Sequence, residues 1–404
     1  MTKQALSWLK VVEYGEFIAA PYCTKLMADM GAEVVKVEAP GAGDRARQHG
    51  PFLEDIPHLE RSGLFLNMNT SKLGVTLNVE TATGREILLR LLQGADVLVE
   101  NNPPQRMKAL GLDYESLRKT NPRLIVTSIT SYGQTGPYKD YKAYDINCAA
   151  ASAVSIGIGL PEREPLTMPF YQCDQQAGIS AAGATYVALC ARDMTGEGQH
   201  VDISETDVMH ALHLGIDIYD WREKGEKEQR SGFRDSQTVY PATTLKCKDG
   251  YVRLRAPQVA QWIRFLALMG TPEWTKEPRY RDRRAMGTQY PEEVDNLLAP
   301  WLMEHTKAEI FEMCLKERVP LAPVNTVAEL VNNEHLKARD YLVEVERSDT
   351  GRLTYPGAPY KFSATPWEIA RPAPLLGQHN EEVYCGRLGY SREELVQLRR
   401  AGII

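Results

Sequence analysis

The sequence lacks clustered cysteines, long apolar runs and blocks of basic residues, and each absence excludes a class of protein. Its seven cysteines are scattered along 404 residues without a CxxC motif or a Cys/His cluster, so neither a metal site nor a disulfide framework is predicted. Reduced cysteines are typical of the cytoplasm, where we expect the protein to be located. No apolar run approaches the ~20 residues that span a bilayer, so no membrane association is expected.

Charge of one sign is not concentrated either. The formal net charge is −6, and the charged residues, which make up 25% of the chain, are spread along it with both signs mixed. Binding of a nucleic-acid backbone needs a basic patch, so no nucleic-acid partner is expected. Hydrophobic residues make up 43% of the chain, and a chain of this length can form two or three domains with large cores.

The N-terminal segment predicts a βαβ unit without a dinucleotide-binding motif. Residues 9–13 and 33–38 are β-branched runs, and residues 21–30 between them have helical spacing, with a proline in the first turn. The turn after the first strand, YGEFIAA at 14–20, lacks the GxGxxG glycines that let a backbone approach a pyrophosphate. A nicotinamide or flavin dinucleotide is therefore disfavoured.

Strand-like and helical segments continue to alternate through the next part of the chain. The β-branched runs at 74–78, 95–100 and 124–128 predict strands, and the segments 82–92 and 114–119 predict helices. This alternation predicts an α/β fold with a mostly parallel sheet flanked by helices.

A second, smaller domain is predicted after the composition becomes polar at 222–234. A hairpin is expected at 245–254, with Asp249 and Gly250 in its turn. Helical patterns follow at 258–269 and 307–317, so the smaller domain is expected to be α+β.

One carboxylate stands at a junction in the chain. Asp174 follows a short aromatic-rich segment and precedes a run of Ala, Gly and Ser, which predicts a helix that approaches its neighbours closely. Asp is a preferred N-cap residue, so the pattern alone favours a helix cap over a catalytic group. The adjacent Cys173 has no His or Lys nearby in sequence to activate it, and we interpret it as a buried packing residue.

Six stretches, taken together and in unbroken order, resemble the family III CoA-transferases, which include the formyl-CoA and carnitine CoA-transferases (the CaiB/BaiF-like group). They read LKVVEYGEFIAAPYCTKLMADMGAEVVKVEAPGAGD, DVLVEN, LGLDYESLRKTNPRLIVTSITSYGQTGPY, GEGQHVDIS, VPLAPVNTVAEL and LGQHNEEVYCGRLGYSREELVQLRRAGII. The resemblance implies a large Rossmann-like domain at 1–220, a small domain at 221–330, and a C-terminal segment, 331–404, that returns to the large domain. It also implies an interlocked dimer, formed by two identical chains or by two homologous subunits.

The resemblance implies a reaction as well. In the family an aspartate acts as the nucleophile at the position matched by Asp174, in a D-x-x-x-G frame before the small-residue helix. Coenzyme A would pass from an acyl-CoA to a free carboxylic acid through a mixed anhydride and an aspartyl-CoA thioester on Asp174. Backbone N–H groups at the helix start are expected to stabilise the oxyanions. CoA thioesters are then substrates, and no cofactor is bound permanently.

Further residues are matched to the family one by one. The expected CoA-binding residues are Phe17, Ile18, Ala19, Lys72, Asn101, Asn102, Lys108 and Lys142, and the expected substrate pocket contains Tyr144 and Asp145. Lys108 stands beside Ala109, where an arginine is common in the family. Lys72 and Lys142 each also fit an ordinary solvated surface position.

Two departures from the family's pattern bear on the substrate. Asn102 replaces the usual Phe, and residues 231–234 (SGFR) stand where formyl-CoA transferase has a run of glycines that covers the intermediate. These departures argue against a formyl or oxalate substrate. We expect a larger acceptor, such as a bulky or aromatic acid related to benzylsuccinate, with succinyl-CoA as a candidate donor.

Two alternative functions stay open. The α-methylacyl-CoA racemases share the fold and use a His/Asp pair, at whose dipeptide this chain has Tyr144 and Asp145; a phenol with an ordinary pKa of about 10 is a poor base at neutral pH. The chain also fits a CoA-binding, non-catalytic subunit of a heteromeric transferase, and the presence of Asp174 argues against that alternative.

Overall fold

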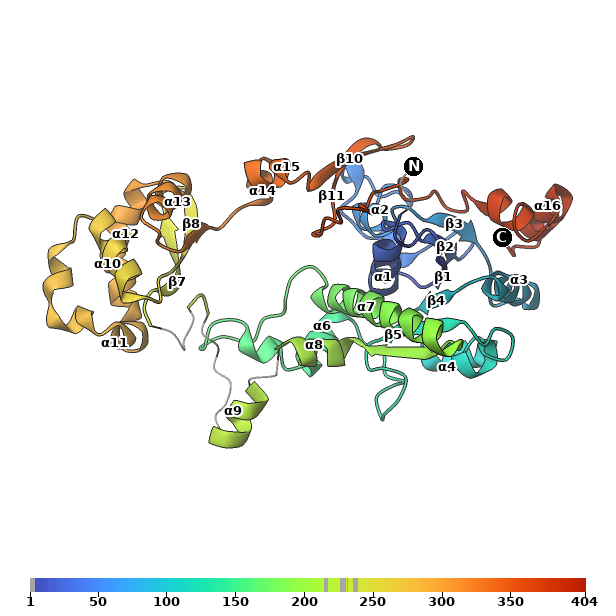
Figure 1. The fold of residues 1–404 in the computed structure, drawn as a ribbon, viewed down its shortest axis with the longest axis horizontal. Helices are drawn as coiled ribbons and strands as arrows, with labels where there is room; N and C mark the ends of the chain where they lie inside the picture. Colours follow the sequence, from blue (N-terminus) through green and yellow to red (C-terminus); the bar gives the residue numbers. More distant parts are fainter. Residues whose placement is uncertain (1–3, 214–216, 226–229, 231, 235–238) are drawn as a thin grey trace. The chain divides into compact units, whose positions relative to one another are not determined.

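The computed structural model describes residues 4–213, 217–225, 230, 232–234 and 239–404 (Figure 1). The chain divides into two compact units. The first comprises Met1–Val154, Thr167–Lys224 and Lys337–Ile404, and the second comprises Ser155–Leu166 and Gly225–Leu336. Residues 155–166 and 331–336 thus belong to the second unit, whereas the sequence analysis assigned the former to the large domain and the latter to the C-terminal segment.

The first unit is built on a six-stranded parallel sheet, which confirms the predicted α/β fold. Its strands are β1 (Lys10–Tyr14), β2 (Glu33–Glu38), β3 (Leu73–Thr76), β4 (Val97–Glu100), β5 (Ile125–Thr130) and β6 (His200–Ser204). The strand order is β3-β2-β1-β4-β5-β6, and every neighbouring pair is parallel. The order reverses between β1 and β4, and ligands of open α/β sheets bind at the carboxyl ends of the strands beside such a point.

Helices pack on both faces of this sheet, α3 (Ala82–Gln93) on one, and α1 (Ala19–Ala28) and α7 (Gln172–Thr195) on the other. The other helices of the first unit are α2 (Gly63–Met68), α4 (Pro104–Leu110), α5 (Tyr114–Leu117), α6 (Asp145–Ala151), α8 (Glu205–His213), α9 (Asp217–Lys224) and α16 (Arg392–Arg400). Within the described residues no helix is both long enough and apolar enough to cross a bilayer.

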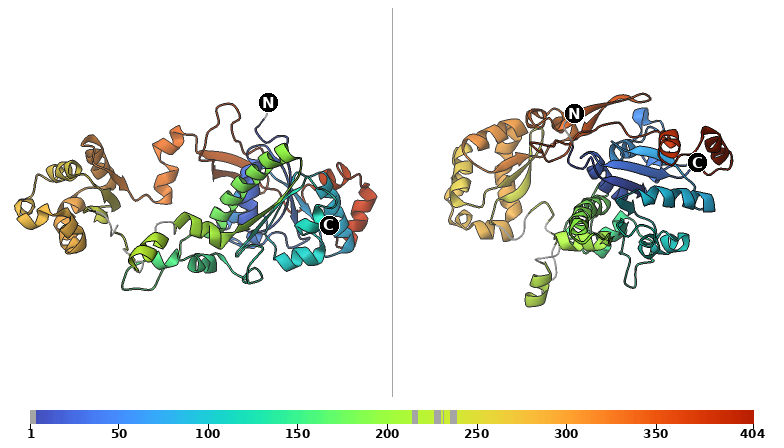
Figure 2. Two further views of the ribbon diagram at one scale, coloured as in Figure 1. Left: turned by 60° about the horizontal axis from the view of Figure 1, so that its bottom comes forward. Right: turned by 45° about the vertical axis from the view of Figure 1, so that its right-hand side comes forward.

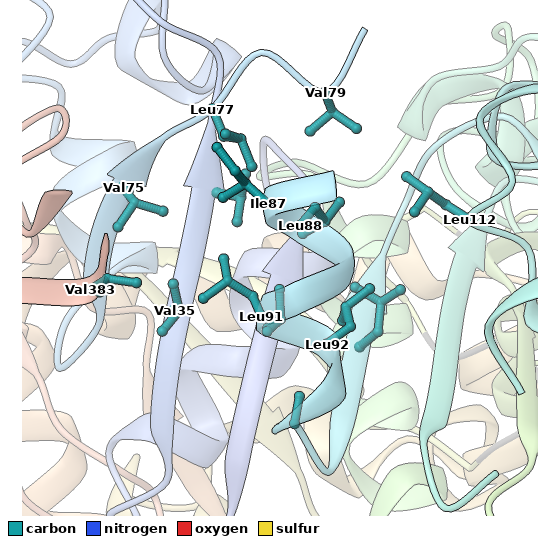
Figure 3. Close-up of a cluster of buried hydrophobic side chains, with 14 of the residues drawn as sticks. Val35, Val75, Leu77, Val79, Ile87, Leu88, Leu91, Leu92, Leu112 and Val383 are labelled. Carbon is teal, nitrogen blue, oxygen red and sulfur yellow. The ribbon is translucent and has the colours of Figure 1, made fainter. Parts of the chain in front are cut away.

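The two faces of the sheet have separate cores because side chains alternate along a strand. Val11 packs in one core with α1 and α7, and its neighbour Val12 packs in the other core with α3. Figure 3 shows the second core, where the apolar stripe of α3 meets Val35 of β2 and Val75 of β3. Burial on both faces explains why the strands are almost continuous β-branched runs.

The C-terminal segment completes the second of these cores. Its hairpin strands are β10 (Leu342–Arg347) and β11 (Gly351–Pro356). Farther along, the Tyr384 hydroxyl donates a hydrogen bond to the carbonyl of Thr76 over 2.8 Å, and Ile404 is buried beside α3. Figure 2 shows this last part of the chain beside the sheet of the first unit. The segment Lys337–Ile404 is therefore part of the first unit.

The second unit is a small α+β domain, as predicted. Its antiparallel strands are β7 (Ala242–Cys247), β8 (Gly250–Arg255) and β9 (Leu321–Pro323). Its helices are α10 (Val259–Leu268), α11 (Arg283–Thr288), α12 (Pro291–Glu304), α13 (Lys307–Lys316) and α14 (Val327–Val331), and α15 (Glu334–Ala338) joins the two units in sequence. The predicted hairpin is confirmed, but its turn lies one residue earlier than expected: Cys247 pairs with Gly250, the first residue of β8, so Lys248 and Asp249 form the turn.

A buried network of charges holds the loops at the carboxyl end of β1. Glu13 receives Lys36 Nζ at 2.6 Å on one carboxylate oxygen and Lys72 Nζ at 2.8 Å on the other, and all three side chains are fully buried. Lys36 also reaches Asp44 at 2.7 Å. Burial alone would raise the pKa of Glu13, but the two lysine charges hold that pKa at about 2. The carboxylate is therefore ionised at neutral pH.

We predict that Glu13→Gln lowers the free energy of unfolding by about 3–5 kcal/mol, because it leaves Lys72 buried without a carboxylate partner. Urea denaturation followed by circular dichroism measures the change. The control is Glu115→Gln, which removes an exposed pair with Arg118 in the same unit and should cost under about 1 kcal/mol. Equal small losses in both variants would show that the buried network does not stabilise the fold.

Candidate active site

Three helices of the first unit begin at one place, and each contributes a carboxyl group there. Asp145 is the first residue of α6, Asp174 lies in the first turn of α7, and Glu205 is the first residue of α8. The three helices pack against one another. Helix N-termini carry partial positive charge, which favours acidic side chains at these positions. The carboxyl groups of Asp174 and Glu205 are hydrogen-bonded to each other.

The contact between α7 and α1 fixes the position of Asp174 (Figures 1 and 2). A Cβ atom added at Gly178 would lie 2.8 Å from the carbonyl oxygen of Ala19 and 3.2 Å from the Cβ of Tyr22. Only a glycine allows this approach of backbone to backbone. Asp174 lies one helical turn before Gly178, so the same contact places it beside the first turn after β1.

Asp145, rather than Asp174, caps helix α7. The Oδ1 atom of Asp145 accepts hydrogen bonds from the backbone N–H groups of Cys173, at 2.7 Å, and Asp174, at 3.4 Å. The N-cap position belongs to Tyr171, whose side chain makes no cap bond. The prediction that Asp174 is the N-cap is therefore wrong. These two N–H groups already bind a carboxylate, so they are not free to stabilise an oxyanion as expected.

The environment of Asp174 opposes its ionisation. Burial raises its pKa, the neighbouring charges of Glu205 and Asp145 raise it further, and the Arg45 guanidinium lowers it, so that the pKa is about 8. At pH 7 the protonated form is then in roughly tenfold excess. The hydrogen bond to Glu205 gives the Asp174 proton an acceptor, and the two carboxyl groups titrate as a pair.

Glu205 is a site residue that the sequence analysis missed. It is buried, with 6% of its surface exposed, and lies 3.4 Å from the Cys148 thiol. Burial raises its pKa above the ordinary range for a glutamate. A sequence signal was available, because Glu205 follows directly on the strand-like HVDIS segment, at the carboxyl end of a parallel strand.

An aromatic wall lies next to the carboxyl groups. The Phe17 ring makes an edge contact with the Tyr171 ring, with 5.1 Å between the ring centroids, and a second one with His49 at 5.0 Å. Phe17 and Tyr171 have φ values of 71° and 52°, and the adjacent Phe170 has 64°. Left-handed backbone is costly for bulky residues and is concentrated at functional sites.

Arg45 is the second site residue that the sequence analysis missed. Its guanidinium carbon lies 5.6 Å from the centre of the Phe17 ring, and its Nε atom lies 2.6 Å from Glu16 Oε1. Its side chain is 52% exposed. Nothing in the sequence separates Arg45 from Arg47, whose buried guanidinium pairs with Glu38 and Glu60.

Three of the expected CoA-binding residues have no exposed surface. Lys72 has no exposed surface, and its Nζ binds Glu13, the carbonyl of Pro21 and the Asn69 side chain. Ile18 and Ala19 are likewise 0% exposed. Their burial contradicts the expected contacts with CoA. Among the three matched first-turn residues only Phe17 has accessible surface.

The two asparagines after β4 hold the first turn in place. The Asn101 side chain accepts from the backbone N–H of Glu16 and donates to its carbonyl, at 2.9 and 2.8 Å. The Asn102 amide donates to the carbonyl of Tyr14 at 2.8 Å, and its side-chain oxygen accepts from Arg106 at 3.0 Å. Both residues therefore shape the turn by backbone contacts.

A cavity of about 300 Å³ opens at the carboxyl ends of the strands, beside the point where the strand order reverses. Its lining includes Tyr14, Glu38, Asn78, Asn102 and Arg106. Asn102 is thus the expected CoA-binding residue that lines it. Lys108 and Lys142 are exposed and do not line this cavity.

Tyr144 and Asp145, the two residues expected in the substrate pocket, have different surroundings in the structure. Asp145 binds the start of α7, whereas Tyr144 precedes α6 with 71% of its surface exposed. Of residues 231–234, which replace the glycine run, position 231 lies outside the described residues.

Comparisons with known proteins place these features in a family. A family model described as CoA-transferase family III matches residues 6–380. The chain is 30% identical, over 397 residues, to the succinyl-CoA–D-citramalate CoA-transferase of Chloroflexus aurantiacus, covering 98% of this chain and 97% of that protein. It is 32% identical, over 418 residues, to the succinyl-CoA:(R)-benzylsuccinate CoA-transferase subunit BbsE of Thauera aromatica, covering 99% and 98%. A crystal structure of a CaiB/BaiF family protein from Brucella suis matches with a TM-score of 0.87 at 29% identity, covering 96% of this chain and 100% of that one.

We predict that Glu205→Gln lowers the pKa of Asp174 by about one unit or more, because it removes a negative charge and supplies an amide donor to the carboxylate. A ¹³C NMR titration of labelled aspartate carboxyls measures the shift, with the resonance assigned by its loss in Asp174→Asn. The control, Asp207→Asn, changes an exposed residue of the same helix α8 and should leave the titration in place. An unchanged pKa in Glu205→Gln would show that Glu205 does not control the proton of Asp174.

Proposed function

The chain belongs to CoA-transferase family III, and we propose that it moves coenzyme A from an acyl-CoA donor to a free carboxylic acid with Asp174 as the temporary carrier. The observation that supports this assignment is the position of Asp174. It is a partly exposed carboxyl group with a raised pKa, fixed at a helix start beside Glu205, which accepts its hydrogen bond. Perturbed carboxyl groups of this kind are typical of catalytic sites.

The carrier chemistry divides one difficult transfer into four exchanges at carbonyl carbons. The Asp174 carboxylate attacks the donor thioester, which gives a mixed anhydride and releases the CoA thiolate. The thiolate attacks the aspartyl carbonyl, which gives an aspartyl-CoA thioester and releases the donor acid. The acceptor carboxylate then attacks this thioester, which gives a second mixed anhydride and releases the thiolate again. Finally the thiolate attacks the acceptor's carbonyl, which leaves the new thioester and a free Asp174.

Each neighbour of Asp174 has a part in these steps. Asp174 attacks as the carboxylate, so its proton must leave first, and Glu205 is the adjacent acceptor. Asp145 holds the main chain of Asp174 through the two bonds at the start of α7. The Phe17 and Tyr171 rings cover the site and limit the access of water, which would hydrolyse an anhydride.

We place the nucleotide end of coenzyme A in the cavity lined by Tyr14, Asn102 and Arg106, because nucleotides bind at the carboxyl ends of the strands in such sheets. Phe17 follows Glu16, which lines this cavity, and its ring contacts Tyr171, which precedes α7. Lys108 and Lys142 are exposed and lie outside this lining, and the proposal keeps them as phosphate contacts on the family resemblance alone. Coenzyme A enters as part of a substrate, so the proposal needs no permanently bound cofactor.

For the substrates we propose succinyl-CoA as the donor and a bulky or aromatic acid related to benzylsuccinate as the acceptor. The support is the similarity to transferases whose names contain succinyl-CoA, one of which is named for (R)-benzylsuccinate. The wall of Phe17 and Tyr171 also offers apolar surface to such an acid.

We propose a cytoplasmic, interlocked dimer as the working assembly. All seven cysteines are unpaired, which supports a reducing compartment. The dimer rests on the family resemblance. One similar protein is named as a subunit, so the partner is either a second copy or a homologous chain, and native mass spectrometry of the assembled protein distinguishes the two.

We predict that Asp174→Asn abolishes transfer, because the amide cannot attack a thioester, while binding of coenzyme A stays within about threefold of wild type. Mass spectrometry of new thioesters measures transfer, and calorimetry measures binding. The control is Asp193→Asn, an exposed residue of the same helix, which should remain active. Hydroxylamine added during turnover should modify Asp174 in the wild type.

Two results would contradict the proposed reaction. Transfer by the Asp174→Asn variant, or a hydroxylamine adduct on another residue, would remove Asp174 as the carrier. Rapid uptake of deuterium at the α-carbon of a 2-methylacyl-CoA, without formation of new thioesters, would instead establish the racemase alternative.

A further inference from the structure

Arg45 is held at the candidate site by a short, well-anchored segment. It is the first residue of a 3₁₀ helix, Arg45–Gln48, whose N-cap Asp44 accepts a hydrogen bond from Ala46 N at 2.7 Å. Asp44 also accepts from the backbone N–H of Phe17 at 2.8 Å. The backbones of residues 17 and 46, on either side of the Arg45 site, are thus tied to one carboxylate, and that carboxylate is anchored by the buried Lys36.

The side chain of Arg45 extends over the aromatic wall toward Asp174. Arg45 lies over the Phe17 ring, Phe17 contacts Tyr171, and Tyr171 directly precedes α7. The charge of Arg45 acts on Asp174 strongly enough to lower its pKa. The cation, the apolar wall and the reacting carboxyl group therefore follow one another along one surface of the first unit.

The ion pair between Arg45 and Glu16 is weak enough for another carboxylate to replace Glu16. Glu16 is 43% exposed and binds the Nε atom of Arg45, and exposed pairs contribute only about 0–1 kcal/mol. Among the described residues no second carboxylate pairs with Arg45. A guanidinium offers five N–H donors in a planar fork, so the Nη side can accept another carboxylate in a bidentate arrangement.

The negative charges around Asp174 would repel an acidic substrate, and the positive charge of Arg45 opposes that repulsion. Asp145 and Glu205 already make the site negative, and any acid that approaches Asp174 brings a further charge. A dicarboxylic acid brings two, and its second carboxylate would be repelled without a positive partner. Arg45 supplies the largest favourable charge acting on Asp174, and it is half-exposed, whereas Arg47, Lys36 and Lys72 are fully buried.

We propose that Arg45 binds the carboxylate that does not exchange coenzyme A, and that the enzyme is therefore selective for dicarboxylic acids and their monothioesters. This inference rests on the proposed function and names the residue that sets its substrate class. Arg45 releases Glu16 when the substrate's distal carboxylate binds. The carbon skeleton between the two carboxylates lies along Phe17 and Tyr171, which leaves room for an apolar substituent.

The test compares succinate with butyrate, because both have four carbons and they differ by one carboxylate. Acetyl-CoA is the donor for both, so the donor carries no free carboxylate on its acyl group. Assays are run at about pH 9, above the pKa of Asp174, so that loss of the Arg45 charge does not reduce the ionised fraction of the nucleophile. The variants are Arg45→Gln and Arg45→Lys, and Arg106→Gln serves as the contrast.

In the wild type we expect succinate to be preferred over butyrate. Arg45→Gln should lower kcat/KM for succinate by about 10- to 100-fold, chiefly by raising KM, and leave butyrate within about threefold. Arg45→Lys should restore part of the preference, because it keeps the charge and loses the fork. Arg106→Gln, in the proposed nucleotide cavity, should weaken use of acetyl-CoA equally with both acids.

Two kinetic results would overturn the inference: equal losses with succinate and butyrate in Arg45→Gln, or a wild-type preference for butyrate. Calorimetric titration of each acid in the presence of free coenzyme A measures binding without turnover. If transfer fails but succinate binds tightly and Arg45→Gln weakens that binding, the proposed reaction is contradicted and the role of Arg45 stands. If succinate and butyrate bind alike, the role of Arg45 is contradicted whether or not transfer occurs.

Discussion

The candidate site depends on the backbone contact between α1 and α7. Gly178 lies against the carbonyl of Ala19 with no room for a side chain. This contact fixes the distance between the two helices at the N-terminal end of α1, near the N-terminal part of α7. Phe17 arrives just before α1 and Asp174 within the first turn of α7, so one steric constraint brings together parts of the chain that are far apart in sequence. A substitution at Gly178 that folds would move Asp174 relative to the aromatic wall.

At the start of α7, interactions that oppose the ionisation of Asp174 are partly offset by interactions that favour it. Burial and the charges of Glu205 and Asp145 oppose the ionisation of Asp174, and burial opposes that of Glu205. Three helix N-termini and the Arg45 charge act in the opposite direction. The Asp145 carboxylate accepts a hydrogen bond from the backbone of α7, while the carboxyl groups of Asp174 and Glu205 are hydrogen-bonded to each other. The result is a carboxyl group that is mostly neutral when the site is empty and that has a proton acceptor within reach.

The sequence predicted the fold better than the site, and the reason is the range of the interactions involved. Strands buried on both faces are β-branched runs, and a hairpin turn is local, so both were visible without tertiary structure. Lys72 was expected to contact CoA because it matches a family position, and the local pattern could not show that its buried partner, Glu13, lies in β1. Asp174 was read as a cap because the true cap, Asp145, precedes it by 29 residues. The nucleophile hypothesis came from the family resemblance and not from the local pattern.

Arg45 and Arg47 show most clearly what a pattern cannot decide. They stand in one short segment, two residues apart, and have the same chemistry. Arg47 is buried between Glu38 and Glu60 and lies 3.6 Å from the Phe65 ring, so it belongs to the fold. Arg45 points the other way, onto Phe17, with one exposed partner. A 3₁₀ helix has three residues per turn, so neighbouring side chains on it face different surroundings. The turn that Asp44 begins therefore identifies Arg45 as the cation whose charge acts on Asp174, and it leaves Arg45 with one exposed ion pair, which the proposed substrate carboxylate would replace.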